Sequence, residues 1–345
     1  MNPEITDPED PRVADDLPST GLVDPEDRPR FAELRARLAA AACARLHPQL
    51  HAWTDAAGRL EHVLTDIDAA LARCSDLTIA RRDALRFGGP DAAPADYIGR
   101  LLAHDGAHAL TGLRFKGMRR DHPFLEVVAT DLPPDSPRLP GLLAAVAAAW
   151  APLAPRALRL FVGSHEAPPS LPSGARRESD LRVLVAPVAE LQQRPPPPQY
   201  DALTLRRCVD LEFYPRFRAA YDAFNAGHPA LAESMYLSTA EDLQPVVAGG
   251  HLYEAWHGEQ WAGLVAAARE RCFGRDSWLV HEELLAAPFR GRGLGPALQR
   301  RLIDHLDPAG GALLYGTIHA DNPASIATAR RVGRLDVGGH VFVIL

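Results

Sequence analysis

The sequence contains almost no lysine and very few cysteines. Lys116 is the only lysine among 345 residues, so nearly all of the positive charge is carried by arginine. The four cysteines, Cys43, Cys74, Cys208 and Cys272, stand far apart and have no paired spacing. Neither a disulfide framework nor a zinc site is therefore indicated. We expect reduced thiols, no bound metal and a cytoplasmic location.

The sequence also lacks a long hydrophobic run and an excess of positive charge. The segment 1–10 is acidic and contains prolines, unlike a signal peptide, and no other stretch is apolar enough to span a membrane. The net charge of -7 argues against a nucleic-acid partner, which calls for a basic face. The same charge is compatible with a cationic acceptor such as an amine. We expect no membrane and no nucleic-acid partner.

A run of four prolines marks the clearest internal boundary. A chain of 345 residues exceeds the usual size of one hydrophobic core, which favours two domains. The run lies in residues 192–199, and it favours an extended spacer because prolines cannot continue a helix or a central strand. Residues 1–28 are rich in Asp, Pro and Glu and are expected to form a flexible acidic arm. The predicted domains are therefore 29–191 and 200–345.

The second domain contains a glycine-rich segment between a predicted strand and a predicted helix, Arg290-Gly291-Arg292-Gly293-Leu294-Gly295. Glycines let the backbone approach a phosphate closely. Free N–H groups and the dipole at a helix amino terminus favour negative charge, and the two arginines add countercharge. The segment indicates a diphosphate site, although an ordinary glycine-rich turn is the alternative if it is taken alone.

A second motif stands downstream, where Asn322-Pro323-Ala324-Ser325-Ile326 opens a helix that Gly333-Arg334 closes. Together with Arg290-x-x-Gly293-x-Gly295, it resembles the paired signatures of the GNAT superfamily of acyl-CoA N-acyltransferases. The resemblance covers essentially the whole second domain. It implies an α/β fold with a mixed, mostly antiparallel central sheet flanked by helices, in which the family's fourth and fifth strands splay apart at a bulge.

The resemblance also implies how acyl-CoA, most often acetyl-CoA, is held as a co-substrate. Pantetheine inserts between the splayed strands and pairs with the strand backbone, while the phosphates sit on the amides of the glycine-rich segment. The helix of the second motif lies along the pantetheine arm. The implied cofactor-binding residues are Leu285, Arg290, Gly291, Arg292, Gly293, Leu294, Gly295, Asn322 and Ser325.

Acyl transfer to an amine requires a base, because an alkyl ammonium with a pKa near ~10 is mostly charged at neutral pH. Strand alternation puts His281, Glu283 and Leu285 on one face and Glu282 on the other, unless a bulge shifts the register. The resemblance implies a histidine base at His281, and Glu283 is the second candidate. A water chain, with these groups only lining a pocket, is the alternative. The N–H of Leu285 is expected to stabilise the oxyanion.

One position departs from the family pattern. Many family members have a tyrosine seven residues after the signature asparagine, where it acts as the acid toward the departing thiolate. That position is Ala329 in this sequence. Arg334 also stands where phenylalanine is commoner. The general acid is therefore unassigned.

The first domain shows the same predicted order of strand, strand, helix and strand, in residues 109–115, 124–130, 139–150 and 157–162. It has no glycine-rich segment between its second strand and its helix, where residues 131–137 contain three prolines instead. The domain is either a degenerate GNAT-like repeat, which gives two such domains in tandem, or an unrelated α/β domain.

We expect the second domain to transfer an acyl group, most readily acetyl, to a small-molecule amine or peptide acceptor by direct attack in a ternary complex. The first domain is expected to be accessory and to shape the acceptor site. One alternative is a non-catalytic coenzyme A sensor, which Ala329 favours. Another is an aminoacyl-tRNA-dependent transferase, which the acidic balance disfavours. The sequence leaves open the acceptor, the acyl length and whether the protein is a monomer or a homodimer.

Overall fold

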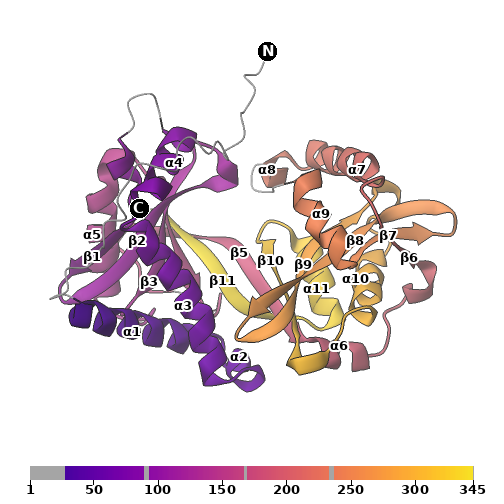
Figure 1. Cartoon of the computed structure of the whole chain (residues 1–345), viewed down its shortest axis with the longest axis horizontal. Helices are drawn as coiled ribbons and strands as arrows, with labels where there is room; N and C mark the ends of the chain where they lie inside the picture. The colour runs from indigo at the N-terminus through magenta and orange to yellow at the C-terminus, as the bar shows by residue number, and fades with distance from the viewer. Residues whose placement is uncertain (1–27, 89–92, 167–168, 233–236, 345) are drawn as a thin grey trace, which may run out of the picture.

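The computed structural model describes residues 28–88, 93–166, 169–232 and 237–344. The arm predicted at 1–28 therefore lies outside the described residues, apart from its last residue. Eleven strands form one continuous sheet in the order β1-β2-β3-β4-β11-β5-β10-β9-β8-β7-β6. Two lobes meet at the centre of this sheet (Figure 1). Two neighbouring pairs are parallel and the others antiparallel, so the predicted mixed, mostly antiparallel α/β fold is confirmed.

The first half of the chain forms one lobe and one exchanged strand. Its α-helices are α1 (Arg28–Arg45), α2 (Pro48–Trp53), α3 (Ala56–Arg73), α4 (Leu77–Phe87), α5 (Leu139–Trp150) and α6 (Val188–Gln193). Its strands are β1 (Arg100–His104), β2 (Ala107–Phe115), β3 (Pro123–Thr130), β4 (Leu158–Val162) and β5 (Arg176–Pro187). Short 3-10 turns are η2 (Pro94–Tyr97), η3 (Lys116–Met118) and η4 (Ala151–Leu153).

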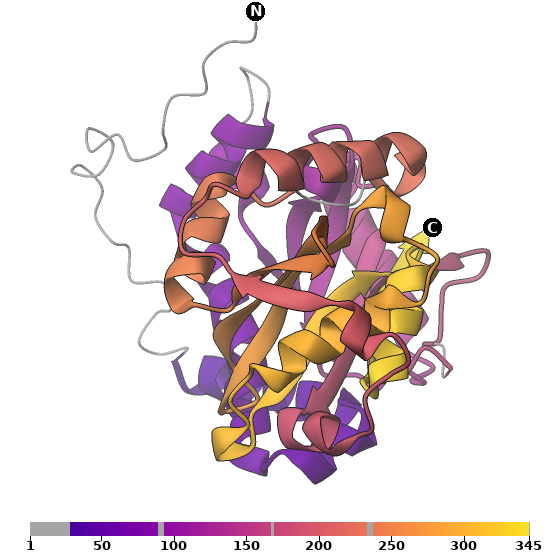
Figure 2. The same cartoon turned by 90° about the vertical axis from the view of Figure 1, so that its right-hand side faces the viewer.

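The second half forms the other lobe. Its α-helices are α7 (Tyr214–Gly227), α8 (Pro229–Ala232), α9 (Ala240–Gly249), α10 (Leu294–Asp304) and α11 (Pro323–Val332). Its strands are β6 (Thr204–Arg207), β7 (Leu252–His257), β8 (Gln260–Cys272), β9 (Arg275–Leu285), β10 (Leu313–His319) and β11 (Leu335–Ile344). Its 3-10 turns are η5 (Tyr200–Ala202), η6 (Ala287–Phe289) and η7 (Ala309–Gly311). Figure 2 shows this lobe from the side, with the yellow and orange helices across the middle.

The two halves repeat one strand arrangement. Parallel neighbours β3 and β4 are joined through α5, and parallel neighbours β9 and β10 are joined through α10. The β2–β3 ladder skips Val128 and the β8–β9 ladder skips His281. Each skipped residue lies three positions after the residue at which its strand begins to pair with its parallel neighbour, Leu125 and Trp278 respectively. The first half is therefore a structural repeat of the second, and the fold is a tandem one.

The two halves exchange their last strands. Strand β5 of the first half lies between β10 and β11, and β11 of the second half lies between β4 and β5. Figure 1 shows the yellow β11 running from the second lobe into the first. Neither half therefore completes its sheet without a strand from the other. The proline-rich segment predicted at 192–199 follows the exchanged strand, and the division into an accessory and a catalytic domain stays a prediction.

The hydrophobic core follows this exchange. One cluster packs α1 and α3 against strands of both halves and contains Leu38, Ile67, Val185, Leu313 and Val337. In the second half, α10 covers one face of the sheet and α7 and α9 cover the other, through separate clusters. None of the helices in the described ranges has the length and hydrophobicity needed to cross a bilayer.

Candidate functional site

Strands β9 and β10 separate soon after they meet. They pair at two positions, Trp278 with Leu314 and Leu279 with Tyr315. Beyond these positions β9 continues to Leu285 with register partners on β8 alone within the described part of the chain. The gap that opens between the two strands is the splay that the resemblance predicts, and the bulge at its start is present.

The free edge of β9 presents backbone groups to this gap. Ala286 donates its N–H to the carbonyl of Ala262 at 2.8 Å. Because backbone groups alternate in direction along an antiparallel pair, those of Leu285 point away from β8. The Leu285 carbonyl accepts a hydrogen bond from Nε of Arg290 at 2.7 Å, and the Arg290 guanidinium lies 4.8 Å from the ring centre of Phe224. Arg290 thus ties the loop to β9 and α7, and the N–H of Leu285 is left facing the gap.

The loop after β9 is open and has the backbone conformation that its glycines allow. Gly291 and Gly293 have φ values of 70° and 75°, and a Cβ atom at either position would meet nothing within 4 Å. Gly293 precedes α10, which Leu294 anchors because its side chain is buried. A Cβ at Gly295 would lie 2.6 Å from Oγ1 of Thr328. Glycine at 295 therefore lets α11 pack on the first turn of α10.

Helix α11 begins and ends where its sequence dictates. The Asn322 side chain accepts the N–H of Ser325 at 3.1 Å, an N-cap that satisfies one of the free donors of the first turn. Gly333 ends the helix at a φ of 109°, which favours glycine. Asn322 and Ser325, predicted to contact the cofactor, thus also cap the helix. Ala329 is fully buried, so it offers no polar group in place of the family's tyrosine.

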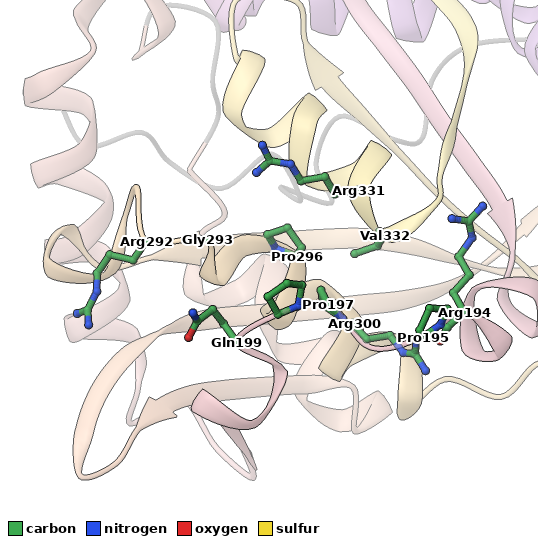
Figure 3. A pocket seen from close by; sticks show the side chains of 11 residues that line it. Arg194, Pro195, Pro197, Gln199, Arg292, Gly293, Pro296, Arg300, Arg331 and Val332 are labelled. Carbon is green, nitrogen blue, oxygen red and sulfur yellow. Dashed lines mark hydrogen bonds between the residues drawn. The ribbon is translucent and has the colours of Figure 1, made fainter.

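A cavity of about 530 Å³ lies beside this loop, between α10, α11 and the proline-rich segment (Figure 3). Arg292 and Arg194 lie toward opposite ends of it, and Pro296 and Pro197 lie near its middle. Its full lining is Arg194, Pro195, Pro197, Pro198, Gln199, Arg292, Gly293, Pro296, Arg300, Arg331 and Val332. The sequence does not reveal this cavity, because a run of prolines by itself indicates only a spacer.

The bulge at His281 changes which side chains face the same way. Glu282 accepts a hydrogen bond from the Ser238 hydroxyl at 2.5 Å, on the side of the sheet covered by α9. Glu283 accepts one from Nε2 of Gln299, on α10, at 2.5 Å. The negative charge of the Asp242 carboxylate, on α9, raises the pKa of both His281 and Glu282. Glu282 and Glu283 thus face opposite sides of the sheet, and the bulge at His281 interrupts the simple alternation that grouped it with Glu283.

Burial gives these groups unusual proton affinities. It raises the pKa of Glu282 to about 7, against the opposing hydrogen bond from Ser238. It lowers the pKa of His281, whose Nε2 is buried without a hydrogen-bond partner among the described residues. The lowered pKa favours the neutral form of His281, and the raised pKa leaves Glu282 partly ionised near pH 7, so both can accept a proton. Glu282 is a candidate that sequence reasoning missed, because no local signal places the bulge.

Glu283 belongs to a different pair. Burial raises its pKa to about 7, while the Gln299 hydrogen bond and the charge of Arg334 act in the opposite direction. Arg334 is 3% exposed and donates through Nη2 to the Leu184 carbonyl at 2.8 Å. Burial lowers its pKa to about 10. The predicted base Glu283 thus lies on the α10 side with an internal countercharge.

The first half borders the far edge of the gap through β5, which pairs with β10 and carries Asp180 near the end of β10. Asp180, on the exchanged strand β5, lies with its Oδ1 3.8 Å from Nε2 of His319 at the end of β10. Its carbonyl accepts the N–H of Ala320 at 2.7 Å, and its other carboxylate oxygen lies 2.9 Å from Nε of Arg159. The end of β10 is therefore held by the first half.

The corresponding gap in the first half is filled. Arg45, the last residue of α1, donates through Nη2 to the carbonyl of Thr130 at the end of β3. Its own carbonyl oxygen would lie 1.8 Å from a Cβ atom on Gly163, just after β4. Burial lowers the pKa of Arg45 to about 10, with the Asp131 carboxylate opposing. The end of α1 thus lies between the ends of β3 and β4, at the position that corresponds to the open gap between β9 and β10.

Comparison with curated proteins finds one partial similarity. The chain is 42% identical to L-2,4-diaminobutyric acid acetyltransferase of Nocardia farcinica over 59 residues. The alignment covers 17% of this chain and 31% of that enzyme, so the chain spans less than a third of the length of the curated relative that it matches. No protein-family model matches the chain.

Several solved structures are also similar. A GCN5-related N-acetyltransferase from Sphaerobacter thermophilus is 18% identical with a TM-score of 0.46, over 81% of this chain and 91% of that one. One from Kribbella flavida is 16% identical with a TM-score of 0.41, over 78% and 94%. A tandem GNAT protein from the clavulanic acid biosynthesis pathway is 14% identical with a TM-score of 0.42, over 79% and 88%. The proteins to which this chain is similar thus include GNAT proteins, and the chemistry of the site is argued from its own residues.

Proposed function

We propose that the chain is an acyl-CoA-dependent N-acyltransferase, with acetyl-CoA as the acyl donor and the second half as the catalytic one. The observation that carries this proposal is the free edge of β9 leading directly into an open loop at the amino terminus of α10. The resemblance stated from the two motifs supplies the reaction class. Bound acyl-CoA would supply an activated thioester, and the protein would supply the positioning and the proton transfers.

The residues around the gap fit such a donor. The amides at 291–295 and the dipole of α10 suit a diphosphate, because residues 291–293 are exposed and a Cβ atom at Gly291 or Gly293 would meet nothing within 4 Å. The N–H of Leu285 suits the pairing of an extended amide arm with β9. We assign the nucleotide end to the cavity beside α10, where Arg292 and Arg331 supply countercharge. Among the described residues, no group of three or more His, Cys, Asp or Glu is placed to hold a metal ion.

The acceptor is proposed to approach from the side of α7 and α9. Glu282 faces that side and His281 is the bulge residue next to it, and either can take the proton that an ammonium must lose before it attacks. The carboxylates of Glu282 and Asp242 favour a cationic acceptor. We therefore propose a small primary amine, which is consistent with a curated relative named for a diamino acid. The N–H of Leu285 would stabilise the oxyanion, and the thiolate would leave without a tyrosine acid.

The test is a thiol-release assay with acetyl-, propionyl- and longer acyl-CoA against a panel of amines. His281→Gln or Glu282→Gln is expected to lower kcat by about 10²–10⁴-fold and to leave the Kd for acetyl-CoA unchanged. Glu259→Gln, in the β7–β8 turn, is the matched control and should behave as the unaltered protein. If neither substitution at 281 or 282 lowers turnover, both residues are removed from the mechanism.

The pH profile separates the two candidate bases. Because the pKa of Glu282 is raised to about 7, a Glu282 base predicts that kcat/KM rises toward pH 7 and then levels off. Glu282→Gln should abolish this limb while His281→Gln keeps it. The opposite pattern would assign the proton transfer to His281.

A second candidate function is a non-catalytic coenzyme A sensor, which the buried Ala329 favours. It predicts calorimetric binding of acetyl-CoA without thiol release for any amine in the panel. Absence of acetyl-CoA binding itself would contradict both functions.

A further inference from the structure

A second cavity, of about 610 Å³, lies where the two halves meet on the side of α11. Its walls come from the segment before α2, the loop after β4, the exchanged strand β5 and the turn from α11 into β11. The lining residues are His47, Ser164, His165, Glu166, Arg182, Arg194, Arg330, Gly333, Arg334, Leu335 and Asp336. None of the loop residues 290–295 takes part in it. It is thus distinct from the proposed acyl-CoA site.

One residue forms a wall between this cavity and the first. Arg194 lines both, and its side chain lies against Gly333, where a Cβ atom would come within 2.4 Å of the Arg194 Nε. Two adjacent arginines of α11 line different cavities: Arg331 lines the first and Arg330 lines the second. Two adjacent residues therefore report on two different sites.

The second cavity carries an excess of positive charge in a chain whose net charge is -7. Four arginines line it against two carboxylates, Glu166 and Asp336. One of the four, Arg334, is the buried countercharge of Glu283, so three arginines remain for a ligand. The Asp336 Oδ2 is shared between Nε of Arg182 at 2.6 Å and Nη2 of Arg330 at 3.0 Å. A guanidinium group has five N–H donors, and one shared carboxylate cannot use all of those of two arginines. Both Arg182 and Arg330 therefore keep further donors for a ligand. The side chain of Arg330 is 54% exposed, so its remaining donors are accessible, and that of Arg182 is 22% exposed.

Neutral donors complete the lining. His165 lines the cavity, but both of its ring nitrogens are buried, and the Gly338 backbone lies near the ring. The hydroxyl oxygen of Ser164 accepts the N–H of Glu166 at 3.1 Å, which leaves its own O–H able to donate. Guanidinium groups and a hydroxyl donor that line one cavity suit the oxygens of a phosphate.

We infer that this cavity binds a small phosphate monoester. Its volume lies within the range of small-molecule sites, and its guanidinium groups suit the oxygens of a dianion better than a single carboxylate. Because its walls come from both halves, an occupant would hold them together where the exchanged strands cross. The inference stands independently of acyl transfer, since it invokes no residue of the glycine loop or of β9.

The test is calorimetric titration of the full-length protein, free of acyl-CoA, with inorganic phosphate and then with a sugar phosphate, against chloride at matched ionic strength. Arg330→Ala removes one charge-assisted donor and is expected to weaken binding about tenfold or more. Arg331→Ala is the matched control, because it removes the same charge from the adjacent position of α11, which lines the other cavity. Binding that survives Arg331→Ala and is weakened by Arg330→Ala supports the inference.

A second variant gives a change of opposite sign. Asp336→Asn removes the carboxylate that competes for Arg182 and Arg330, so phosphate should bind more tightly than to the unaltered protein. Thermal unfolding checks that this variant is folded, and if it is not, the comparison of Arg330→Ala with Arg331→Ala decides the test. No saturable phosphate binding, or binding that Arg330→Ala leaves unchanged, overturns the inference. Acetyl-CoA binding, measured separately on Arg330→Ala, should be unchanged, so failure here is distinguishable from failure of the proposed function.

Discussion

The gap between β3 and β4 and the gap between β9 and β10 share their topology and differ in what fills them. Both follow a bulge at the same position, at Val128 and at His281. In the first half the end of α1 enters the gap, and Arg45 binds the Thr130 carbonyl. In the second half the edge of β9 stays free and leads into a loop with two left-handed glycines. The two halves therefore share the strand arrangement around the gap. The end of α1 closes it in the first half, and the glycine loop leaves it open to a ligand in the second.

The exchange of β5 and β11 gives the closed first half a structural role in the second half. Strand β10, the far edge of the open gap, pairs with β5 along its whole length, from Leu313 opposite Pro187 to His319 opposite Leu181. A sheet edge without such a partner would expose its backbone groups. The first half thus contributes a structural wall to the candidate site even though its own gap is filled.

The largest expected effect comes from separating the halves. A protein of residues 200–345 alone has β10 and β11 without β5 between them, so it should not unfold cooperatively by circular dichroism. A protein of residues 176–345 regains β5 and α6 and is the control, which should recover part of the cooperative transition. A stable, cooperative 200–345 fragment that binds acetyl-CoA would contradict the structural role of the exchange.

The next effect sharpens the difference between the two loops. Gly293→Val places a β-branched side chain at a φ of 75°, which such residues avoid, and covers the amides of the loop. We expect the affinity for acetyl-CoA to fall about 100-fold, because lost hydrogen bonds and added backbone strain together cost about 2–3 kcal/mol of binding free energy. Asp135→Val, exposed in the loop after β3, is the matched change in the first half and should leave the Kd unaltered. Equal losses in both variants would mean that both loops bind the donor.

A third effect concerns the residues that follow each bulge. Glu283 and Thr130 occupy equivalent positions, and only Glu283 titrates. Its pKa is raised from 4.5 to about 7, so the folded state favours the protonated carboxyl. The stabilisation is fully present below about pH 4.5 and is lost as the pH rises through about 7. The difference in unfolding free energy between the unaltered protein and Glu283→Gln should therefore change by up to about 3 kcal/mol across this range. Denaturant titrations at pH values on either side measure it, and a constant difference would contradict the raised pKa.

The sequence predicted the elements whose signals are local. The ranges 139–150 and 323–332 were predicted as helices and coincide with α5 and α11, because proline lies at the start of each and Gly333 ends the second. The glycine loop, the strands on either side of it and the order repeated in the first half were also predicted. These features depend on neighbouring residues, so one sequence is enough to find them.

The rest depends on contacts between distant residues. Strand β5 was not predicted, since Arg176, Arg177, Glu178 and Asp180 give it a charged start and its partners lie in the other half. The bulge at His281 has no local signature, so the positions of Glu282 and Glu283 were uncertain until their contacts were known. The two arginine-lined cavities combine segments far apart in sequence, which no spacing rule connects.

The smallest effect tests whether the closed gap matters for binding at all. Arg45→Ala removes the donor to the Thr130 carbonyl and should destabilise the protein by about 1–3 kcal/mol, the usual cost of a buried acceptor left without a partner. Acetyl-CoA should still bind with one site per chain and an unchanged Kd, because the backbone of α1 remains beside Gly163 and no glycine loop follows β3. Arg37→Ala, exposed on the same helix, is the control for loss of charge. Thermal unfolding and calorimetric stoichiometry measure the two outcomes, and a second binding site in Arg45→Ala would show that one arginine, and not the missing loop, closes the first half.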